Sequence, residues 1–191
     1  MIKKYFSISL CLVALLATAP VLAQEKDMSA GEESQMPAFG PPEEMKSVAV
    51  MVGDWTFKGE ARMSPDADWM PIEATASIEY AVGGAALLME YEGPMMGMTM
   101  KGLSLTCFDR ETGHWQETWV DNFSGRLSLY TGTFENGEFV TAGKDLMGGK
   151  EYFSRNTTFN ITDTSFEWTM ENSDDGEAWY VSMRGTYTKK Q

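Results

Sequence analysis

The sequence has few residues of the kinds that build disulfide bridges or histidine sites. Among its 191 residues there are 2 cysteines and 1 histidine. Cys11 lies in an apolar run near the N-terminus, so once that run is removed Cys107 has no cysteine to pair with. Because His114 is the only histidine, a zinc site with two or three imidazole ligands is excluded, and its expected position in a turn disfavours haem ligation. We expect neither a metal nor another cofactor.

Motifs of nucleophilic catalysis are also missing. The sequence contains no Gly-x-Ser-x-Gly elbow that would present a serine nucleophile. A Ser-His-Asp relay would have to use His114, which follows a glycine in the expected turn. We therefore expect a protein that is not an enzyme. Carboxylate chemistry at Glu117 or Asp121 is the catalytic alternative.

Basic residues are scarce. The chain has 15 Lys and Arg against 28 Asp and Glu, a formal net charge of −13. A surface this acidic repels phosphate backbones and anionic lipid head groups, so neither nucleic acid nor a membrane surface is an expected partner. Solubility is the simpler explanation of the charge.

Long apolar runs are absent except near the N-terminus. Lys3 and Lys4 precede an apolar run over 8–16, and small residues lead to Ala23. This order is typical of a signal peptide, here 1–23. The run is shorter than the roughly 20 residues that a spanning helix needs. We expect a protein that is exported, to the periplasm or beyond, and that does not insert into the membrane after cleavage.

The next segments differ in character. Residues 24–41 are polar and acidic without periodicity, which predicts a flexible acidic spacer before a single domain at 42–191. A proline and two glutamates then begin a short helix from about Pro42 to Met51. Its apolar residues at helical spacing are Met45, Val48, Ala49 and Val52. We expect this helix to close one end of the fold.

From Trp55 onward, apolar and polar residues alternate with a period of two, as in strands with one dry face. The predicted inner sets of the first three strands are Trp55, Phe57, Ala61 and Met63; Ile72, Ala74, Ala76, Ile78, Tyr80 and Val82; and Ala85, Leu87, Met89 and Tyr91. Those of the last two strands are Phe166, Trp168 and Met170, then Trp179, Val181 and Met183. About ten strands joined by tight turns predict an all-β, antiparallel up-and-down barrel, because closure removes exposed edges. A two-sheet sandwich is the alternative.

Several motifs resemble those of known families. Gly53-x-Trp55 on the first strand and Arg184 on the last resemble lipocalin-like (calycin) barrels. That resemblance implies that Arg184 covers Trp55 at the closed end, in a cation–π contact. A longer string, over roughly 42–189, resembles a family of bacterial exported proteins, the domain of unknown function numbered 1579. It consists of Gly53-Asp54-Trp55, Gly83-Gly84, Met95-Met96-Gly97-Met98, Phe108-Asp109 and Trp119-Val120-Asp121. Phe108 departs from the tyrosine expected there, and the family name implies no chemistry.

Met96, Met98 and Met100 are predicted to share one face of a strand that begins at about Met96. Three interpretations stay open. The thioethers fill the core, line a cavity for adaptable apolar ligands, or bind Cu(I). Copper is the least favoured, because methionine is scattered through the whole chain.

The following strand carries Trp115, Glu117, Trp119 and Asp121 on one face. If the tryptophans face inward, the carboxylates go with them and need a partner or a proton. The row would then supply the polar contacts of a mostly apolar pocket. The alternative is an outward face near a rim, with partly exposed indoles and solvated acids.

Together these patterns favour an exported, non-enzymatic barrel that binds a small apolar or amphipathic ligand. The predicted ligand-binding residues are Tyr91, Met96, Met98, Met100, Trp115, Glu117, Trp119 and Asp121. Gly53, Trp55 and Arg184 are predicted to close the barrel. The alternative is a protein–protein interaction module whose barrel is filled by its own side chains. Asp174-Asp175-Gly176-Glu177 lacks the length of a calcium loop and is predicted to be a turn.

Overall fold

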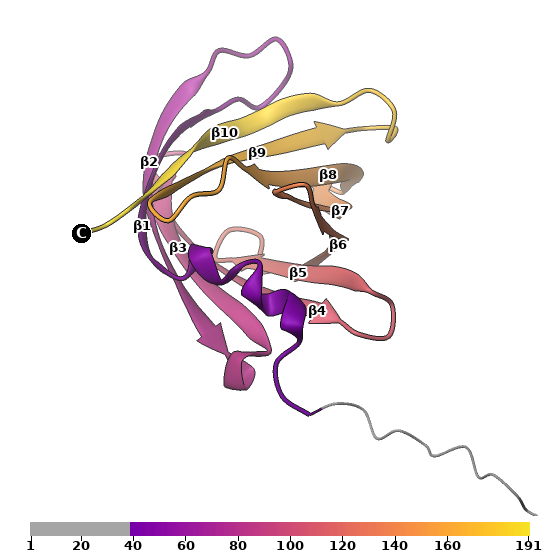
Figure 1. The fold of residues 1–191 in the computed structure, drawn as a ribbon. Coiled ribbons are helices and arrows are strands. Elements are labelled where there is room, and N and C mark those ends of the chain that lie inside the picture. The colour runs from indigo at the N-terminus through magenta and orange to yellow at the C-terminus, as the bar shows by residue number, and fades with distance from the viewer. Residues whose placement is uncertain (1–38) are drawn as a thin grey trace, which may run out of the picture. The chain divides into compact units, whose positions relative to one another are not determined.

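The computed structural model describes residues 39–191 (Figure 1). The predicted signal peptide, 1–23, and most of the predicted spacer, 24–41, lie outside the described residues. The described residues belong to one compact unit, Ala38–Gln191.

Ten antiparallel strands form a closed barrel within this unit. Each strand pairs with the next one along the chain, and β1 pairs with β10, which closes the sheet (Figure 1). The strands are β1 (Gly53–Ala61), β2 (Met70–Ala81), β3 (Ala86–Met95), β4 (Met98–Asp109), β5 (His114–Asp121), β6 (Ser128–Glu135), β7 (Glu138–Met147), β8 (Lys150–Phe159), β9 (Ser165–Ser173) and β10 (Tyr180–Lys189). The short 3-10 helices are η1 (Glu43–Lys46), η2 (Ala49–Met51) and η3 (Val82–Gly84). The predicted all-β, up-and-down barrel is confirmed.

The segment before β1 is not the single helix that the spacing predicted. It forms η1 and η2, because the hydrogen bonds run from Met45 N–H to the Pro42 carbonyl and from Met51 N–H to the Val48 carbonyl, three residues back. Met45 and Val48 are buried in the core. The segment therefore covers the end of the barrel at which β1 begins, and we call this end the helical end.

Strand β2 shows how the period of two places the core. Ile72, Ala74, Ala76 and Ile78 are buried, and the residues between them are exposed. The predicted inner set wrongly includes Tyr80 and Val82, which are exposed. Val82 has a φ of 52° and begins η3, so the pleat has ended there. Met63 is likewise exposed, since β1 ends at Ala61.

Strand β10 carries a bulge that the sequence pattern did not predict. Met183 pairs with Met170, whereas Val181 pairs with Glu171, and the register shifts between them. A bulge moves the residues before it to the other face of the sheet. The prediction that Trp179, Val181 and Met183 share one face is therefore wrong.

Aromatic rings fill the helical end. Trp55 lies edge-on to Phe166, with ring centroids 4.7 Å apart. Tyr187 stacks on Phe166 at 4.6 Å and also contacts Phe57 at 4.7 Å. These rings come from β1, β9 and β10, so their packing joins the first strand to the last two.

The predicted cover of Trp55 by Arg184 is wrong. Tyr187 faces inward, and with the period of two Arg184 faces outward, where its Nε lies 2.8 Å from Glu60 and its guanidinium lies over Trp69 at 4.5 Å. Lys189, two residues after Tyr187, also faces inward, and its ammonium lies 5.2 Å from the centroid of the Trp55 ring. Lys189 thus makes the cation–π contact at the closed end.

Candidate functional site

The row predicted on β5 faces the barrel interior. Trp115 is buried and packs edge-on against Phe108 and Phe139. In the sheet register Glu117 lies opposite Thr106 on β4 and Tyr130 on β6, and both of these side chains face inward. The tryptophans therefore carry the carboxylates inward with them, and the outward alternative does not apply.

Glu117 is held by hydroxyl groups inside the barrel. The Thr141 hydroxyl donates to it, with Oγ1 2.5 Å from Oε2, and Ser104 also forms a hydrogen bond with it. Thr141 and Ser104 are both buried. Desolvation raises the pKa of Glu117 above its ordinary value, and the two hydroxyl groups oppose part of this shift. The carboxyl group is therefore biased toward its protonated, uncharged form.

The pKa of Asp121 is shifted in the opposite direction to that of Glu117. Its Oδ1 accepts the backbone N–H groups of Phe123 and Ser124, at 2.9 and 2.7 Å, and its Oδ2 accepts the Trp119 indole N–H at 2.8 Å. Partial burial raises the pKa of Asp121, but these hydrogen bonds outweigh it and hold the pKa below its ordinary value. Asp121 is thus a charged carboxylate that fixes the Trp119 indole.

The Trp119 indole packs against Gly102 on the neighbouring strand β4. A Cβ atom added to Gly102 would lie 2.3 Å from the indole Cη2 atom, so any other residue there would displace the indole. Tyr91 meets the same indole edge-on, with centroids 5.9 Å apart. Met100 is buried on the same inner face of β4. The structure therefore brings Tyr91, Met100 and Trp119 together as one apolar wall.

The other two methionines do not join this wall. Met96 is 70% exposed and Met98 is 60% exposed. Strand β4 begins at Met98, because Met96 and Gly97 form the turn after β3 with φ angles of 49° and 77°. The prediction that Met96, Met98 and Met100 share one strand face is therefore wrong for Met96, and Met98 lies at the exposed strand end.

Strands β6 to β9 place a second group of polar side chains on the inner face. They are Ser128, Tyr130, Thr141, Asp145, Ser154, Asn156, Thr158 and Asn172. The hydroxyl groups of Ser128 and Tyr130 both donate to Asp145. Burial, with the hydrogen bond to Asp145, raises the pKa of Tyr130 far above its ordinary value. Asp145 is thus held by two donors.

Three atoms of this group have no hydrogen-bond partner among residues 39–191. They are Ser154 Oγ, Asn156 Oδ1 and Asn172 Oδ1. Ser154 is 0% exposed and Asn172 is 7% exposed. Ser154 pairs directly with Asn172, which places their Cβ atoms about 5 Å apart, and Asn156 is the next inward residue on β8. Each unsatisfied buried group costs about 1–3 kcal/mol.

Sequence reasoning missed these three residues. Strand β8 alternates weakly, with polar residues on both faces, as in Ser154-Arg155-Asn156-Thr157. The available signal was the run of Ser, Asn and Thr within a predicted strand, but it did not reveal which residues point inward. The register against β7 and β9 decides that.

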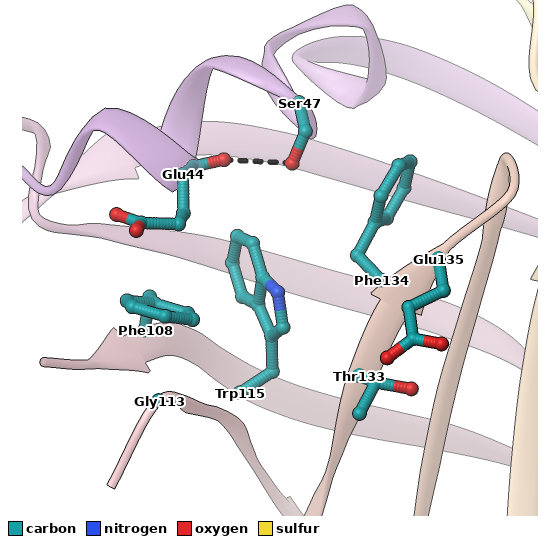
Figure 2. Close-up of a pocket in the computed structure, with 8 residues that line it drawn as sticks. All are labelled: Glu44, Ser47, Phe108, Gly113, Trp115, Thr133, Phe134 and Glu135. Carbon is teal, nitrogen blue, oxygen red and sulfur yellow. Dashed lines mark hydrogen bonds between the residues drawn. The ribbon is translucent and has the colours of Figure 1, made fainter.

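A pocket of about 270 Å³ lies at the helical end. Figure 2 shows the rings of Phe108, Trp115 and Phe134 beneath η1, where the Ser47 hydroxyl donates to the Glu44 carbonyl at 2.7 Å. Trp115 is the one residue of the predicted ligand-binding set that lines this pocket. The pocket is small, near the lower limit of about 300 Å³ for ligand sites. Its lining combines the three rings with polar residues such as Glu44 and Glu135.

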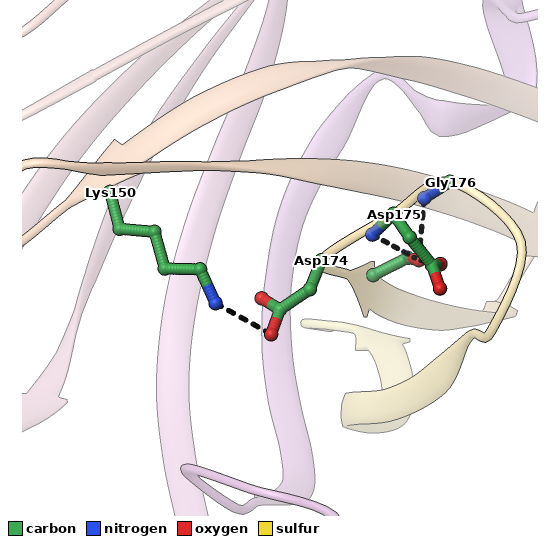
Figure 3. A network of polar contacts seen from close by, with 5 residues as sticks. Lys150, Asp174, Asp175 and Gly176 are labelled. Carbon is green, nitrogen blue, oxygen red and sulfur yellow. Dashed lines mark hydrogen bonds and ion pairs between the residues drawn. The ribbon is translucent and has the colours of Figure 1, made fainter.

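The loop after β9 is a hydrogen-bonded turn. Figure 3 shows Lys150 paired with Asp174, and the Lys150 Nζ lies 2.6 Å from Asp174 Oδ2. The Ser173 hydroxyl oxygen accepts the backbone N–H groups of Asp175 and Gly176. Asp175 in turn accepts backbone N–H groups from two following residues, which lowers its pKa. Within residues 39–191, no three His, Cys, Asp or Glu side chains gather in a way that could hold a metal ion.

The described part of the chain also holds no helix long and apolar enough to cross a bilayer. Comparison with curated proteins finds no match. The sequence profile of one family, described as "Protein of unknown function (DUF1579)", matches residues 40–189. This match covers the whole barrel, from before β1 to the end of β10, and the chain belongs to the DUF1579 family.

Proposed function

We propose that the barrel binds a small apolar or amphipathic molecule in its interior and does not act as an enzyme. The observation that carries this proposal is the set of unpartnered polar atoms on the inner face, Ser154 Oγ, Asn156 Oδ1 and Asn172 Oδ1. Nearly all buried polar groups of folded proteins have hydrogen-bond partners. A bound molecule with a polar group would supply partners to these atoms.

The apolar part of the molecule has a surface beside this group. Tyr91, Met100 and Trp119 lie on β3, β4 and β5, and they turn apolar side-chain surface toward the interior. Glu117 stands between this wall and the polar side chains, since it pairs across to Tyr130 on β6. An amphipathic molecule fits the arrangement, because these three side chains are apolar and the side chains of β8 and β9 offer hydrogen bonds.

Native mass spectrometry of the protein purified from its own host tests the proposal. We expect a retained small molecule as added mass, and a smaller retained fraction in Trp119→Leu, because the substitution removes the indole from the wall. Leu103→Val is the matched control, since Leu103 is the outward neighbour of Gly102 on β4. An unliganded mass for the native protein, with the interior filled by water in a high-resolution crystal structure, would reject the function.

We also propose that the chain is exported, on the strength of the signal-like residues 1–23. Fractionation of host cells with an antibody tests this. Protein confined to the cytoplasm at its full mass would contradict it.

The second candidate is an interaction module, and one observation on the outer face favours it. A hollow of about 680 Å³ lies across β8, β9, β10 and β1, lined by charged and apolar groups such as Lys58, Phe159 and Arg184. A hollow of that kind suits a segment of a partner protein. Cross-linking through Lys58 in host extracts would reveal the partner, and a Lys58→Ala control should lose the product.

A further inference from the structure

The charges inside the barrel restrict the ligand class of the proposed function. The inner face carries Glu117, Asp121 and Asp145 on β5 and β7. Each of these carboxyl groups already accepts hydrogen bonds from the protein. The donors are Thr141 and Ser104 for Glu117; Trp119, Phe123 and Ser124 for Asp121; and Ser128 and Tyr130 for Asp145. No cationic ligand is needed to satisfy them.

The basic side chains of residues 39–191 lie elsewhere. Those in ion pairs on the outer face or in loops are Lys46, Lys58, Lys101, Lys144, Lys150, Arg155 and Arg184. Arg62 donates to the carbonyls of Val181 and Pro65, and Lys189 covers Trp55 at the helical end. Arg126 is exposed in the loop after β5, where its charge acts on Tyr152. Arg110 donates to the Gly40 carbonyl at 2.6 Å, and Lys190 is exposed after β10.

An anionic head group would therefore enter a region with three carboxyl groups, where residues 39–191 place no buried basic side chain to neutralise it; the exposed Arg126 is the basic residue whose charge reaches Tyr152 beside them. Transfer of an unpaired carboxylate into such a place is strongly unfavourable. A cationic head group must itself be desolvated, and this cost offsets its attraction to the carboxylates. The atoms that lack partners are uncharged, namely two amide oxygens and one hydroxyl oxygen.

We propose that the ligand is an uncharged amphiphile whose head group donates hydrogen bonds, such as a primary alcohol or amide, and that the barrel discriminates against carboxylate amphiphiles. The Asn156 and Asn172 amide oxygens are covered in this structure, so both side chains turn toward the head group when it donates to them, and the Ser154 hydroxyl completes the contact. This inference rests on the proposed ligand-binding function and specifies its substrate class.

Three probes of equal chain length test the inference, namely decan-1-ol, decanoate and decylamine. Their affinities are measured at neutral pH and below their aggregation thresholds, by quenching of tryptophan fluorescence and by calorimetry. We expect decan-1-ol to bind at least about tenfold more tightly than decanoate, because the site offers no buried counter-charge to a carboxylate. Decylamine should bind no more tightly than decan-1-ol.

Two variants locate the contact. Asn156→Leu and Asn172→Leu each remove one unpartnered amide, so each should weaken decan-1-ol binding and reduce the preference over decanoate, while the melting temperature stays level or rises. Thr157→Val is the matched control, because Thr157 lies between the inward residues of β8 and faces outward. It should leave both affinities unchanged. Two independent variants guard against a folding failure in one of them.

The outcomes separate the inference from the function beneath it. Equal or tighter binding of decanoate would overturn the uncharged-ligand inference and leave ligand binding supported. Loss of decan-1-ol preference in Thr157→Val as well as in the asparagine variants would also overturn it. Binding of none of the three probes, together with an unliganded native mass, would overturn both.

Discussion

The ammonium of Lys189, near the end of β10, lies 5.2 Å from the centroid of the Trp55 ring, near the start of β1. Lys189 also pairs with Trp55 in the sheet register that closes the barrel. The Trp55 indole N–H donates to the Met51 carbonyl at 2.8 Å, so the same ring holds η2. One contact thus joins the first strand, the last strand and the segment that covers the helical end.

Replacement of Lys189 by alanine is expected to lower stability by about 0.5–2 kcal/mol, because the cation–π contact and the cover over the indole are both lost. Chemical denaturation of Lys189→Ala measures the change, with Lys190→Ala as the control, since Lys190 is exposed. Equal midpoints for the two variants would contradict the role of Lys189.

Gly53 and Lys189 are expected to be energetically coupled. Gly53 has a φ of 142°, and a Cβ atom there would lie 2.6 Å from Lys189 Cε. Gly53→Ala should therefore destabilise by about 1–3 kcal/mol, part from backbone strain and part from the clash. The clash disappears when Lys189 is also replaced by alanine. In a double-mutant cycle, the destabilisation of the double variant should therefore be smaller than the sum of the two single destabilisations. Strict additivity would exclude the clash.

The titration of Glu117 should make stability depend on pH. Its folded pKa is raised, so its contribution to stability is full below the unfolded pKa and is lost as pH rises through the folded pKa. Glu117→Gln removes this dependence. The melting temperature of the variant relative to the unmodified protein should therefore increase as pH rises above about 4.3, the ordinary pKa of a glutamate.

Thermal melts across that range check this expectation, with Glu90→Gln as the control on the exposed face of β3. A difference between Glu117→Gln and the unmodified protein that stays constant with pH would show that Glu117 titrates normally.

Gly102 is expected to set the position of the Trp119 indole. In Gly102→Ala the new methyl group would lie 2.3 Å from the ring, so the indole must move away from β4 and its bond to Asp121 must weaken. We expect a shifted tryptophan emission spectrum and a loss of probe binding. Leu103→Ala, on the outer face, should change neither, and an unaltered emission spectrum for Gly102→Ala would refute the packing.

The inner face of β5 shows what the alternating sequence pattern could predict and what it could not. The spacing of Trp115, Glu117, Trp119 and Asp121 predicted one shared face, since side chains of a strand alternate. It did not decide between inside and outside. That choice depends on strands far away in the chain, because Thr141 of β7 supplies the hydroxyl that Glu117 needs in order to be buried.

Local exceptions to the period of two could not be predicted from the pattern. The turn at Met96 and the bulge between Val181 and Met183 each shift the residues beside them. The cation over Trp55 is a similar case. Side chains alternate along β10, so Lys189 faces inward over the ring and Arg184 faces outward to Glu60. A family resemblance alone suggested the wrong residue.

The sequence by itself determined the class of fold and its inner residues on well-patterned strands such as β2, because burial of one strand face follows from local alternation. Only the tertiary structure decided which polar groups share the interior. Ser154, Asn156 and Asn172 meet there through the register of β8 against β9, and register is fixed by pairing between distant segments.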